Sequence, residues 1–358
     1  MARTAYFLIQ LILAKVATSN YNKVNRPTIV LAAPQVGNRY YETSWPDVVS
    51  FLGLYAEQII RRGQDNVLIL GDPDSIAEIR FQYPTLPRDV TMEAYLGDIW
   101  MRDHTAAPMN NPVAFTFAPN YMSVADRSGT QNDFLSFLSQ CGINLPRSSI
   151  VLDGGNVVDN HVDQAVVTSR IFVDNPTINP DVLVNNLATE LGYAELAVVD
   201  EVPGDTTGHS DGMVSFIDNY TLAMTGLELS LETRVRRNLT NQLTGITIVP
   251  LDSYYWDETW EGFSSACGLH INLLATENTL YVPTFGDDPD LQVVGGQSPT
   301  LDTIVLGQIR RNTRKTVVPV PIPYRVCRMG GNLRCLSWQV KGSVANDLVA
   351  RAQSGGCY

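Results

Sequence analysis

The alternation of short apolar segments with longer amphipathic ones constrains the fold of this chain more than any other feature. Four short segments rich in Val, Ile, Leu and Thr have the length and composition of buried strands: residues 28–33, 66–70, 165–168 and 247–251. Between them, three segments carry apolar residues at helical spacing and are predicted as helices: residues 48–60, 133–138 and 180–187. Strands that alternate with helices in this way predict an α/β fold.

The chain is long and apolar enough to bury a large core, because 44% of its 358 residues are hydrophobic. Its length fits two domains or one large one. Lys and Arg number 25 against 37 Asp and Glu, which gives a formal net charge of −12. This balance, with no basic run or tail, argues against nucleic-acid binding and favours cationic substrates.

One cysteine near the C-terminus, Cys335, follows the turn at residues 330–332 and opens an apolar segment. The two glycines of that turn let a ligand approach the backbone closely, and Arg334 is a positive neighbour of the kind that makes a thiolate reactive. Taken alone, Cys335 is better explained as a buried small apolar side chain. Three other segments change that interpretation.

Each of these segments gathers polar side chains that suit a cation. Residues 98–104 hold two carboxylates, an indole and an arginine, and a carboxylate can bind a guanidinium through two hydrogen bonds while an aromatic face covers its plane. In a second segment His209 and Asp211 stand two residues apart, so they would face the same side of a strand end. In the third, Asn272 offers an amide at the start of a predicted strand.

In this order, the four segments resemble the agmatine deiminase and bacterial (Porphyromonas-type) peptidylarginine deiminase family of the guanidine-modifying superfamily. The family's Trp-x-Arg-Asp segment falls on Trp100 and Asp103, which implies a guanidinium-binding aspartate with the indole beside the substrate. Its Gly-His-x-Asp segment implies a general acid/base in His209 and a second guanidinium-binding carboxylate in Asp211. The nucleophile of the family falls on Cys335. Four separated motifs that agree in order are more specific than any one of them.

The resemblance covers most of the chain and implies a single deiminase domain over residues 21–358. The implied fold is a pentein, an α/β propeller of five pseudo-symmetric ββαβ units around a central site. Two Gly-Gly-Asn turns, at residues 154–156 and 330–332, are consistent with an internal repeat. The resemblance places the turn from Asp153 to Asn156 at the rim or scaffold of the site, with Asn156 and Asn272 among the residues that contact substrate.

The implied reaction is hydrolysis of a guanidinium to a ureido group and ammonia. Asp103 and Asp211 would hold the cation and Cys335 would attack its carbon to give a covalent intermediate. His209 would protonate the leaving amine and then deprotonate the hydrolytic water. Neither a metal nor a cofactor is expected.

The substrate is predicted from fewer residues. Agmatine deiminases usually carry histidine directly before the nucleophile, where this chain has Arg334, and Asn272 matches the peptidylarginine branch. We therefore predict peptidyl- or protein-arginine as the substrate. Agmatine, converted to N-carbamoylputrescine, is the alternative, and a non-catalytic guanidinium-binding protein is a further one. Arg127 is the candidate donor to the substrate backbone at the rim, although a solvated loop arginine is the simpler interpretation.

The chain has four histidines, and none stands in a metal-type cluster with cysteine, so zinc is not expected. His104 directly follows Asp103 and would face the opposite side of a strand, which favours a structural role. His161 stands between two aspartates and is interpreted as a solvated loop histidine.

Residues 1–20 contain a short apolar run that follows Arg3 and ends at Lys15 and small residues. This pattern fits a signal peptide or a first helix packed on the domain, and the run is too short to span a membrane. Secretion is favoured if the segment is a signal peptide, and a cytoplasmic location otherwise. The sequence leaves the oligomeric state open.

The cysteines offer an independent indication of compartment. In a secreted protein, four of the five could form two disulfides in any of three connectivities and leave Cys335 free. These four are Cys141, Cys267, Cys327 and Cys357. In the cytosol all five would stay reduced.

Overall fold

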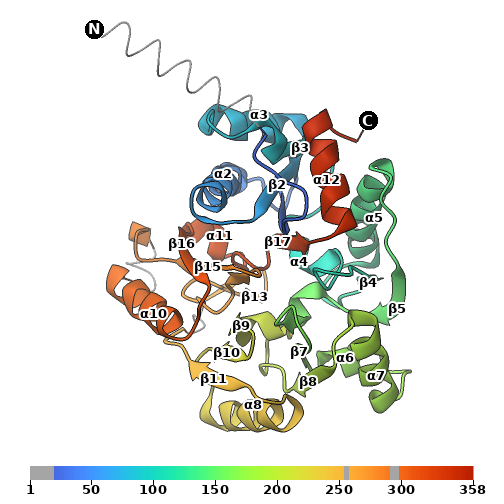
Figure 1. The fold of residues 1–358 in the computed structure, drawn as a ribbon, viewed down its shortest axis with the longest axis vertical. Helices are drawn as coiled ribbons and strands as arrows, with labels where there is room; N and C mark the ends of the chain where they lie inside the picture. The colour runs from blue at the N-terminus through green and yellow to red at the C-terminus, as the bar shows by residue number, and fades with distance from the viewer. Residues whose placement is uncertain (1–19, 254–257, 291–297, 358) are drawn as a thin grey trace, which may run out of the picture.

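Small sheets follow one another around the centre of the molecule in this computed structural model, and most helices lie outside them (Figure 1). The structure describes residues 20–253, 258–290 and 298–357. Among these residues, no helix is both long enough and apolar enough to cross a bilayer. The signal peptide or first helix predicted at residues 1–20 lies, apart from residue 20, outside the described residues.

Three of the sheets share one order of elements. In each, two antiparallel strands are followed by a helical crossover and a third strand parallel to the second. The first comprises β6 (Val158–Asp159), β7 (Gln164–Thr168), α6 (Arg170–Asp174), α7 (Pro180–Leu191) and β8 (Glu195–Val199). The second comprises β9 (Val214–Asp218), β10 (Thr221–Met224), α8 (Leu229–Gln242) and β11 (Thr247–Pro250). The third comprises β14 (Leu274–Ala275), β15 (Thr279–Thr284), α10 (Pro299–Arg311) and β16 (Thr316–Pro321).

The two ends of the described chain meet in a four-stranded sheet. Its order is β17-β1-β2-β3, and the C-terminal strand β17 runs antiparallel to β1. The members are β1 (Thr28–Ala32), α2 (Trp45–Arg62), β2 (Asn66–Gly71), α3 (Pro73–Gln82), β3 (Thr91–Glu93), β17 (Ser337–Val340) and the following helix α12 (Ser343–Ser354). Residues far apart in sequence therefore come together at the start and end of the domain.

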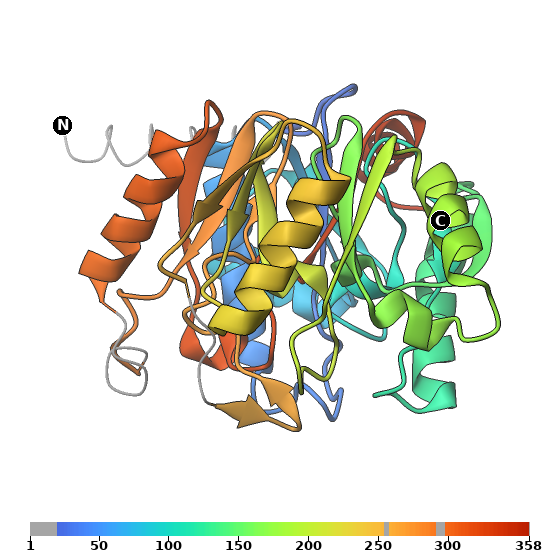
Figure 2. The ribbon, with the colours of Figure 1, turned by 90° about the horizontal axis from the view of Figure 1, so that it is seen from below.

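A fifth, two-stranded sheet pairs β4 (Ala114–Thr116) with β5 (Arg147–Val151) in parallel, and α5 (Val124–Gln140) connects them. A short hairpin of β12 (Thr259–Trp260) and β13 (Phe263–Ser264) projects from one face of the molecule (Figure 2). The remaining elements are short: α4 (Met101–His104), α11 (Tyr324–Cys327) and the single 3₁₀ turns Arg88–Val90, Gly154–Asn156 and Ser210–Gly212.

Alternation of side chains along the strands explains how the four-stranded sheet that contains β1 is covered on both faces. Ile29 and Leu31 of β1 pack in the core cluster that contains the buried face of α2. Val30 points to the other face and packs in the cluster that contains Phe134 of α5 and Leu348 of α12. Both faces are apolar, which is why the strands read as continuous hydrophobic runs.

The helix ends are set by residues outside the apolar stretches that predicted the helices. Ser123 accepts a hydrogen bond from the backbone of Asp126 and begins α5, and Asn179 caps α7 in the same way. Helix α7 ends at Gly192, which has a left-handed backbone conformation with φ of 75°. The predicted helices at residues 48–60, 133–138 and 180–187 are therefore present but longer.

The mixed α/β class is confirmed, and each of the four predicted strands is found in β1, β2, β7 and β11 within a residue or two. Among the described residues, strands of neighbouring sheets do not pair with one another. A closed five-bladed propeller therefore stays a prediction.

Two disulfides stabilise the fold. Cys141 at the end of α5 is bonded to Cys357, and Cys267 is bonded to Cys327. Cys335 is the free cysteine. This is one of the three connectivities that the sequence allows, with the predicted cysteine left unpaired.

Candidate active site

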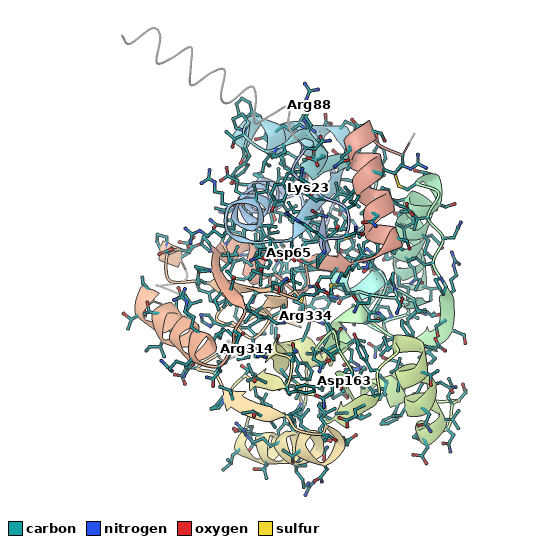
Figure 3. The ribbon with its side chains drawn as sticks, in the orientation of Figure 1. Lys23, Asp65, Arg88, Asp163, Arg314 and Arg334 are labelled. Atoms are coloured by element: carbon teal, nitrogen blue, oxygen red, sulfur yellow. A yellow bond between two sulfur atoms is a disulfide. The ribbon has the colours of Figure 1, made fainter. Side chains whose placement is uncertain are left out.

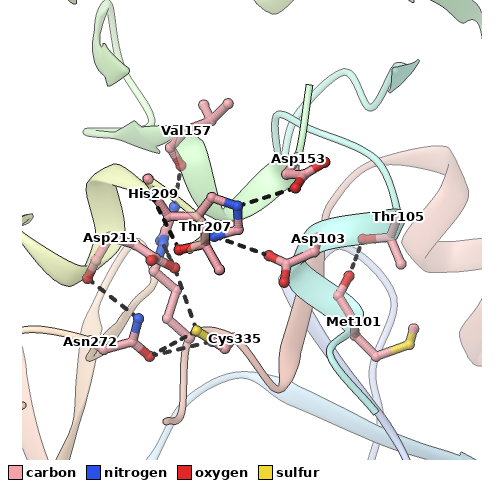
Figure 4. Close-up of polar contacts among 12 residues, drawn as sticks. Met101, Asp103, Thr105, Asp153, Val157, Thr207, His209, Asp211, Asn272 and Cys335 are labelled. Atoms are coloured by element: carbon pink, nitrogen blue, oxygen red, sulfur yellow. Dashed lines mark hydrogen bonds and ion pairs between the residues drawn. The ribbon is translucent and has the colours of Figure 1, made fainter. Parts of the chain in front are cut away.

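The four residues predicted to carry the chemistry line one cavity of about 650 Å³. They come from separate parts of the chain (Figure 4). Asp103 lies on α4, His209 and Asp211 lie at the 3₁₀ turn before β9, and Cys335 lies between the Gly-Gly-Asn turn and β17. The hairpin β12–β13 lines the same cavity.

Asn272 holds the loop that carries the thiol. Its Oδ1 lies 3.4 Å from the Cys335 Sγ and also accepts from the backbone N–H of Cys335 at 3.4 Å. Its Nδ2 donates to the backbone carbonyl of Asp211 at 3.3 Å. Because one amide contacts both segments, it fixes the distance between the thiol and Asp211, whose Oδ2 is 3.8 Å from Sγ.

The thiol of Cys335 is protonated in this arrangement. Burial, followed by the charges of Asp211 and Asp103, raises the pKa of Cys335 well above its ordinary value. A cation placed among these carboxylates would offset their charge and make the thiolate easier to form.

His209 lies between two carboxylates. Its Nε2 is 3.3 Å from Oδ2 of Asp153, and its Nδ1 is 3.7 Å from Oδ1 of Asp103. Burial works to lower the pKa of His209, but the charge of Asp103 and the hydrogen bond and charge of Asp153 outweigh it and raise that pKa to about 10. The imidazolium is therefore the stable form at neutral pH and can serve as a proton donor.

Asp153 is a partner of His209 that the sequence interpretation did not name. It was placed at the rim or scaffold, yet its carboxylate contacts His209 directly and also accepts a hydrogen bond from Tyr121 at 3.0 Å. A usable signal was present: Asp153 directly precedes a Gly-Gly-Asn turn, and the other such turn precedes the nucleophile.

Asp103 and Asp211, here called the clamp carboxylates, are the groups that can hold a cation. Oδ1 of Asp103 is buried and makes no hydrogen bond to the described residues. Burial raises the pKa of Asp103 to about 7, although His209 works in the opposite direction. An entering guanidinium supplies the N–H donors that this carboxylate lacks.

The second glycine of each Gly-Gly-Asn turn gives room to these groups. A Cβ on Gly155 would lie 2.6 Å from Oδ1 of Asp103 and would also strike the His209 ring. A Cβ on Gly331 would lie 2.8 Å from the Cβ of Cys335 and would strike the indole of Trp100. Close approach therefore requires glycine at both positions, and the predicted neighbour Trp100 lies over the nucleophile's turn.

The lining residues other than the four candidates and their neighbours, here called the outer lining, include several aromatic and acidic side chains. Its carboxylates include Asp126 and Asp133 of α5, with Asp205 and Glu261 from other segments. Among the described residues that line the cavity, Arg39 is the one arginine. Aromatic lining residues are Tyr40, Tyr41, Phe117, Tyr121, Trp260 and Phe263.

Two predicted substrate contacts are not brought to the cavity. Asn156 is buried, and its Oδ1 accepts a hydrogen bond from the backbone N–H of Thr168 at 2.9 Å, so it fixes the turn rather than the substrate. Arg127 donates from Nη1 to the carbonyls of Ala118 and Pro119 at 3.0 and 2.9 Å. It secures the segment before α5 and is not a lining residue.

The sequence interpretation of three basic residues is also revised. Arg334 does not lie beside the thiol but pairs with Asp211 at 3.6 Å. His161 is not a solvated histidine, because its side chain is 6% exposed and pairs with Asp159. His104 is buried beside the rings of Phe117 and Phe134, which fits the predicted structural role, although it lies on a short helix rather than a strand.

Comparison with known proteins agrees with the residues gathered in the cavity. Residues 25–340 match the model of the Porphyromonas-type peptidyl-arginine deiminase family. A crystal structure of a protein assigned as a peptidyl-arginine deiminase has a TM-score of 0.69 and 18% identity, covering 91% of this chain and 98% of that one. The agmatine deiminase of C. jejuni also has a TM-score of 0.69, with 17% identity, covering 91% of this chain and 96% of that one.

A protein of Porphyromonas gingivalis assigned as an arginine deiminase has a TM-score of 0.64 and 18% identity, covering 89% of this chain and 96% of that one. No curated protein matches the chain. At these identities the structural likeness shows the shared fold, whereas the family match extends over most of the sequence and includes every residue of the clamp and the nucleophile. The chain therefore belongs to the Porphyromonas-type peptidyl-arginine deiminase family of hydrolytic enzymes.

Proposed function

We propose that this deiminase acts on arginine within a peptide or protein and converts it to citrulline and ammonia. The observation that carries the proposal is the grouping of a thiol, an imidazolium and two clamp carboxylates at the inner end of a cavity of about 650 Å³. Such a volume lies within the range of about 300–1,000 Å³ seen for drug-sized ligands, and agmatine is much smaller.

The roles follow from the distances. Asp103 and Asp211 bind the guanidinium, and its positive charge offsets the carboxylates that keep the Cys335 thiol protonated. When the cation binds, the Cys335 thiol loses its proton to solvent, and the thiolate attacks the guanidinium carbon to form a C–S bond and a tetrahedral adduct. His209, held protonated by Asp103 and Asp153, donates its proton to the departing nitrogen, and ammonia leaves.

The second half of the reaction uses the same groups. Neutral His209 now takes a proton from a water molecule, and the resulting hydroxide attacks the carbon of the thiouronium intermediate. The C–S bond breaks and Cys335 leaves as the thiolate. The proton of the new hydroxyl group passes to this thiolate, which restores the thiol and leaves a neutral ureido product. Trp100 covers the turn beside the nucleophile and encloses the reacting carbon.

The outer lining supports a peptide substrate over free arginine. Four carboxylates, Asp126, Asp133, Asp205 and Glu261, belong to it together with Arg39. An α-carboxylate at this position would be repelled, whereas a peptide bond carries no charge. The aromatic side chains of the outer lining offer apolar surface to the residues that flank the arginine.

Agmatine remains the second candidate, and the same carboxylates are the observation that favours it. Its ammonium group would be attracted to the acidic outer lining. Two of the similar solved structures are agmatine deiminases, from C. jejuni and from Enterococcus faecalis.

A comparison of initial rates of ammonia release separates these substrates. We expect the highest kcat/KM with an arginine peptide blocked at both ends and the lowest with free arginine, with citrulline identified in the peptide by mass spectrometry. A kcat/KM for agmatine that exceeds the peptide value by roughly tenfold, about 1.4 kcal/mol of transition-state binding, would select the second candidate. The Cys335→Ala variant serves as the blank.

We further propose that the five sheets other than the β12–β13 hairpin are the five blades of a propeller around this site. The common strand order of three sheets and the pairing of β17 with β1 support that arrangement.

A further inference from the structure

Arg334 directly precedes the nucleophile, yet its side chain turns away from the cavity. Its side chain is 3% exposed and lies near the centre of the molecule (Figure 3). Nη2 donates a hydrogen bond to the backbone carbonyl of Val157. Nε lies 3.6 Å from Oδ2 of Asp211 and makes no hydrogen bond to the described residues.

The same oxygen of Asp211 also faces the thiol. Oδ2 lies 3.8 Å from Sγ of Cys335 and 3.6 Å from Nε of Arg334, so one carboxylate oxygen contacts both the thiol and the guanidinium. Alone, the carboxylate would oppose ionisation of the thiol, because two negative charges at this distance repel each other in a buried site. The nearby guanidinium of Arg334 offsets part of that repulsion.

Other buried charges surround this pair. Arg102, on α4, donates from Nη2 to Oε1 of Gln339 at 2.9 Å and adds a second positive charge near Asp211. Asp159 faces both arginines and pairs with His161, so it balances the arginines from the side away from the cavity. On the cavity side the charged groups are Asp103 and His209.

We propose that Arg334 is a positioning residue that acts through Asp211. It keeps the Asp211 carboxylate ionised and fixed for the substrate guanidinium, and it lowers the cost of forming the Cys335 thiolate beside that carboxylate. This inference rests on the proposed roles of Cys335 and Asp211 and deepens them, because Arg334 itself contacts neither the substrate nor the thiol.

The thiol can be tested without any substrate. The other four cysteines are bonded in disulfides, so the rate of alkylation by iodoacetamide reports on Cys335. In Arg334→Gln the alkylation profile should move to higher pH by about one unit, which is a roughly tenfold slower reaction at a fixed pH below the thiol pKa. Arg334→Lys, which retains the charge, should restore most of the rate while KM for the arginine peptide stays raised, since lysine lacks the planar fork.

A second variant should shift the pH profile of alkylation in the opposite direction. This test does not depend on whether Arg334→Gln folds. In Asp211→Asn the positive charge of Arg334 is no longer offset, so alkylation should extend to lower pH than in the wild type. Thermal unfolding and titration of free thiols establish that each variant is folded with both disulfides formed.

The results separate this inference from the proposed function. An alkylation profile that stays unchanged in folded Arg334→Gln, or in Asp211→Asn, overturns the role of Arg334 even if deimination is observed. A loss of turnover in Arg334→Gln with unchanged alkylation and unchanged KM would indicate a purely structural arginine. Conversely, the alkylation profiles of the variants could shift while the wild-type protein releases no ammonia. That result would support the charge arrangement and contradict the proposed function.

Discussion

Substitution of Gly331 by alanine should damage the site by steric displacement alone. The added Cβ would lie 2.8 Å from the Cβ of Cys335, whereas two such carbons need about 3.5 Å, so they must separate by about 0.7 Å. The methyl group would also strike the indole of Trp100, so movement in the other direction is blocked. Gly331 does not have a left-handed backbone conformation, and the effect therefore comes from space rather than from strain in φ.

Two magnitudes follow. Overpacking of this kind costs about 1–3 kcal/mol of unfolding free energy. Displacement of the nucleophile by most of an ångström should lower kcat/KM by roughly tenfold to a hundredfold, because a misplacement of about 1 Å can cost that much. Urea denaturation measures the first quantity, and initial rates of ammonia release from a blocked arginine peptide measure the second.

Gly129→Ala is the matched control. Gly129 also lines the cavity, but it lies within α5 and a Cβ there would meet nothing within 4 Å. Alanine in a helix is favoured over glycine by about 0.5–1 kcal/mol, so this variant should be slightly more stable and fully active. If folded Gly331→Ala keeps the kcat/KM of Gly129→Ala, the reasoning that places Trp100 and Cys335 against this glycine is refuted.

Three further predictions concern the nucleophile, the acid and the disulfides. Cys335→Ala should lose several powers of ten in kcat while the clamp carboxylates still bind substrate in calorimetry, and more than about a tenth of wild-type activity would contradict covalent catalysis. Asp153→Asn removes one of the three carboxylates that raise the pKa of His209, so that pKa, followed by NMR, should move down from about 10 and the alkaline limb of kcat/KM should move with it; an unmoved resonance would argue against the contact. Serine at both Cys141 and Cys357 should lower the free energy of unfolding by about 2–5 kcal/mol in urea, whereas an unchanged midpoint would show that this disulfide adds nothing.

The elements and the chemistry of the site followed from the sequence to different degrees. Runs such as residues 66–70 are apolar because both faces of the sheet are covered, so the strands were predictable from composition. The candidate nucleophile, the clamp carboxylates and the candidate acid/base were predicted from four motifs in a fixed order. Their convergence in one cavity could not be read from spacing, because the residues come from separate units of the fold.

The errors share one physical cause. Asp153 and Asn156 were placed by the family resemblance and Arg127 by its loop, but the direction of a side chain is decided by its tertiary partners. Asp153 turns to His209, Arg127 turns to two carbonyls before α5, and Asn156 turns to the backbone of Thr168. A buried polar group takes whichever partner the packed structure offers, and that partner is often distant in sequence.

The sequence by itself determined the α/β class and the set of candidate reactive residue types, since these depend on local periodicity and motif order. Tertiary structure decided the disulfide pairing, the direction of Arg334 and the protonation of the site. Nearby carboxylates raise the pKa of His209 against the opposing effect of burial, whereas burial and carboxylates together raise the pKa of Cys335. Those shifts depend on distances between segments that only the folded chain establishes.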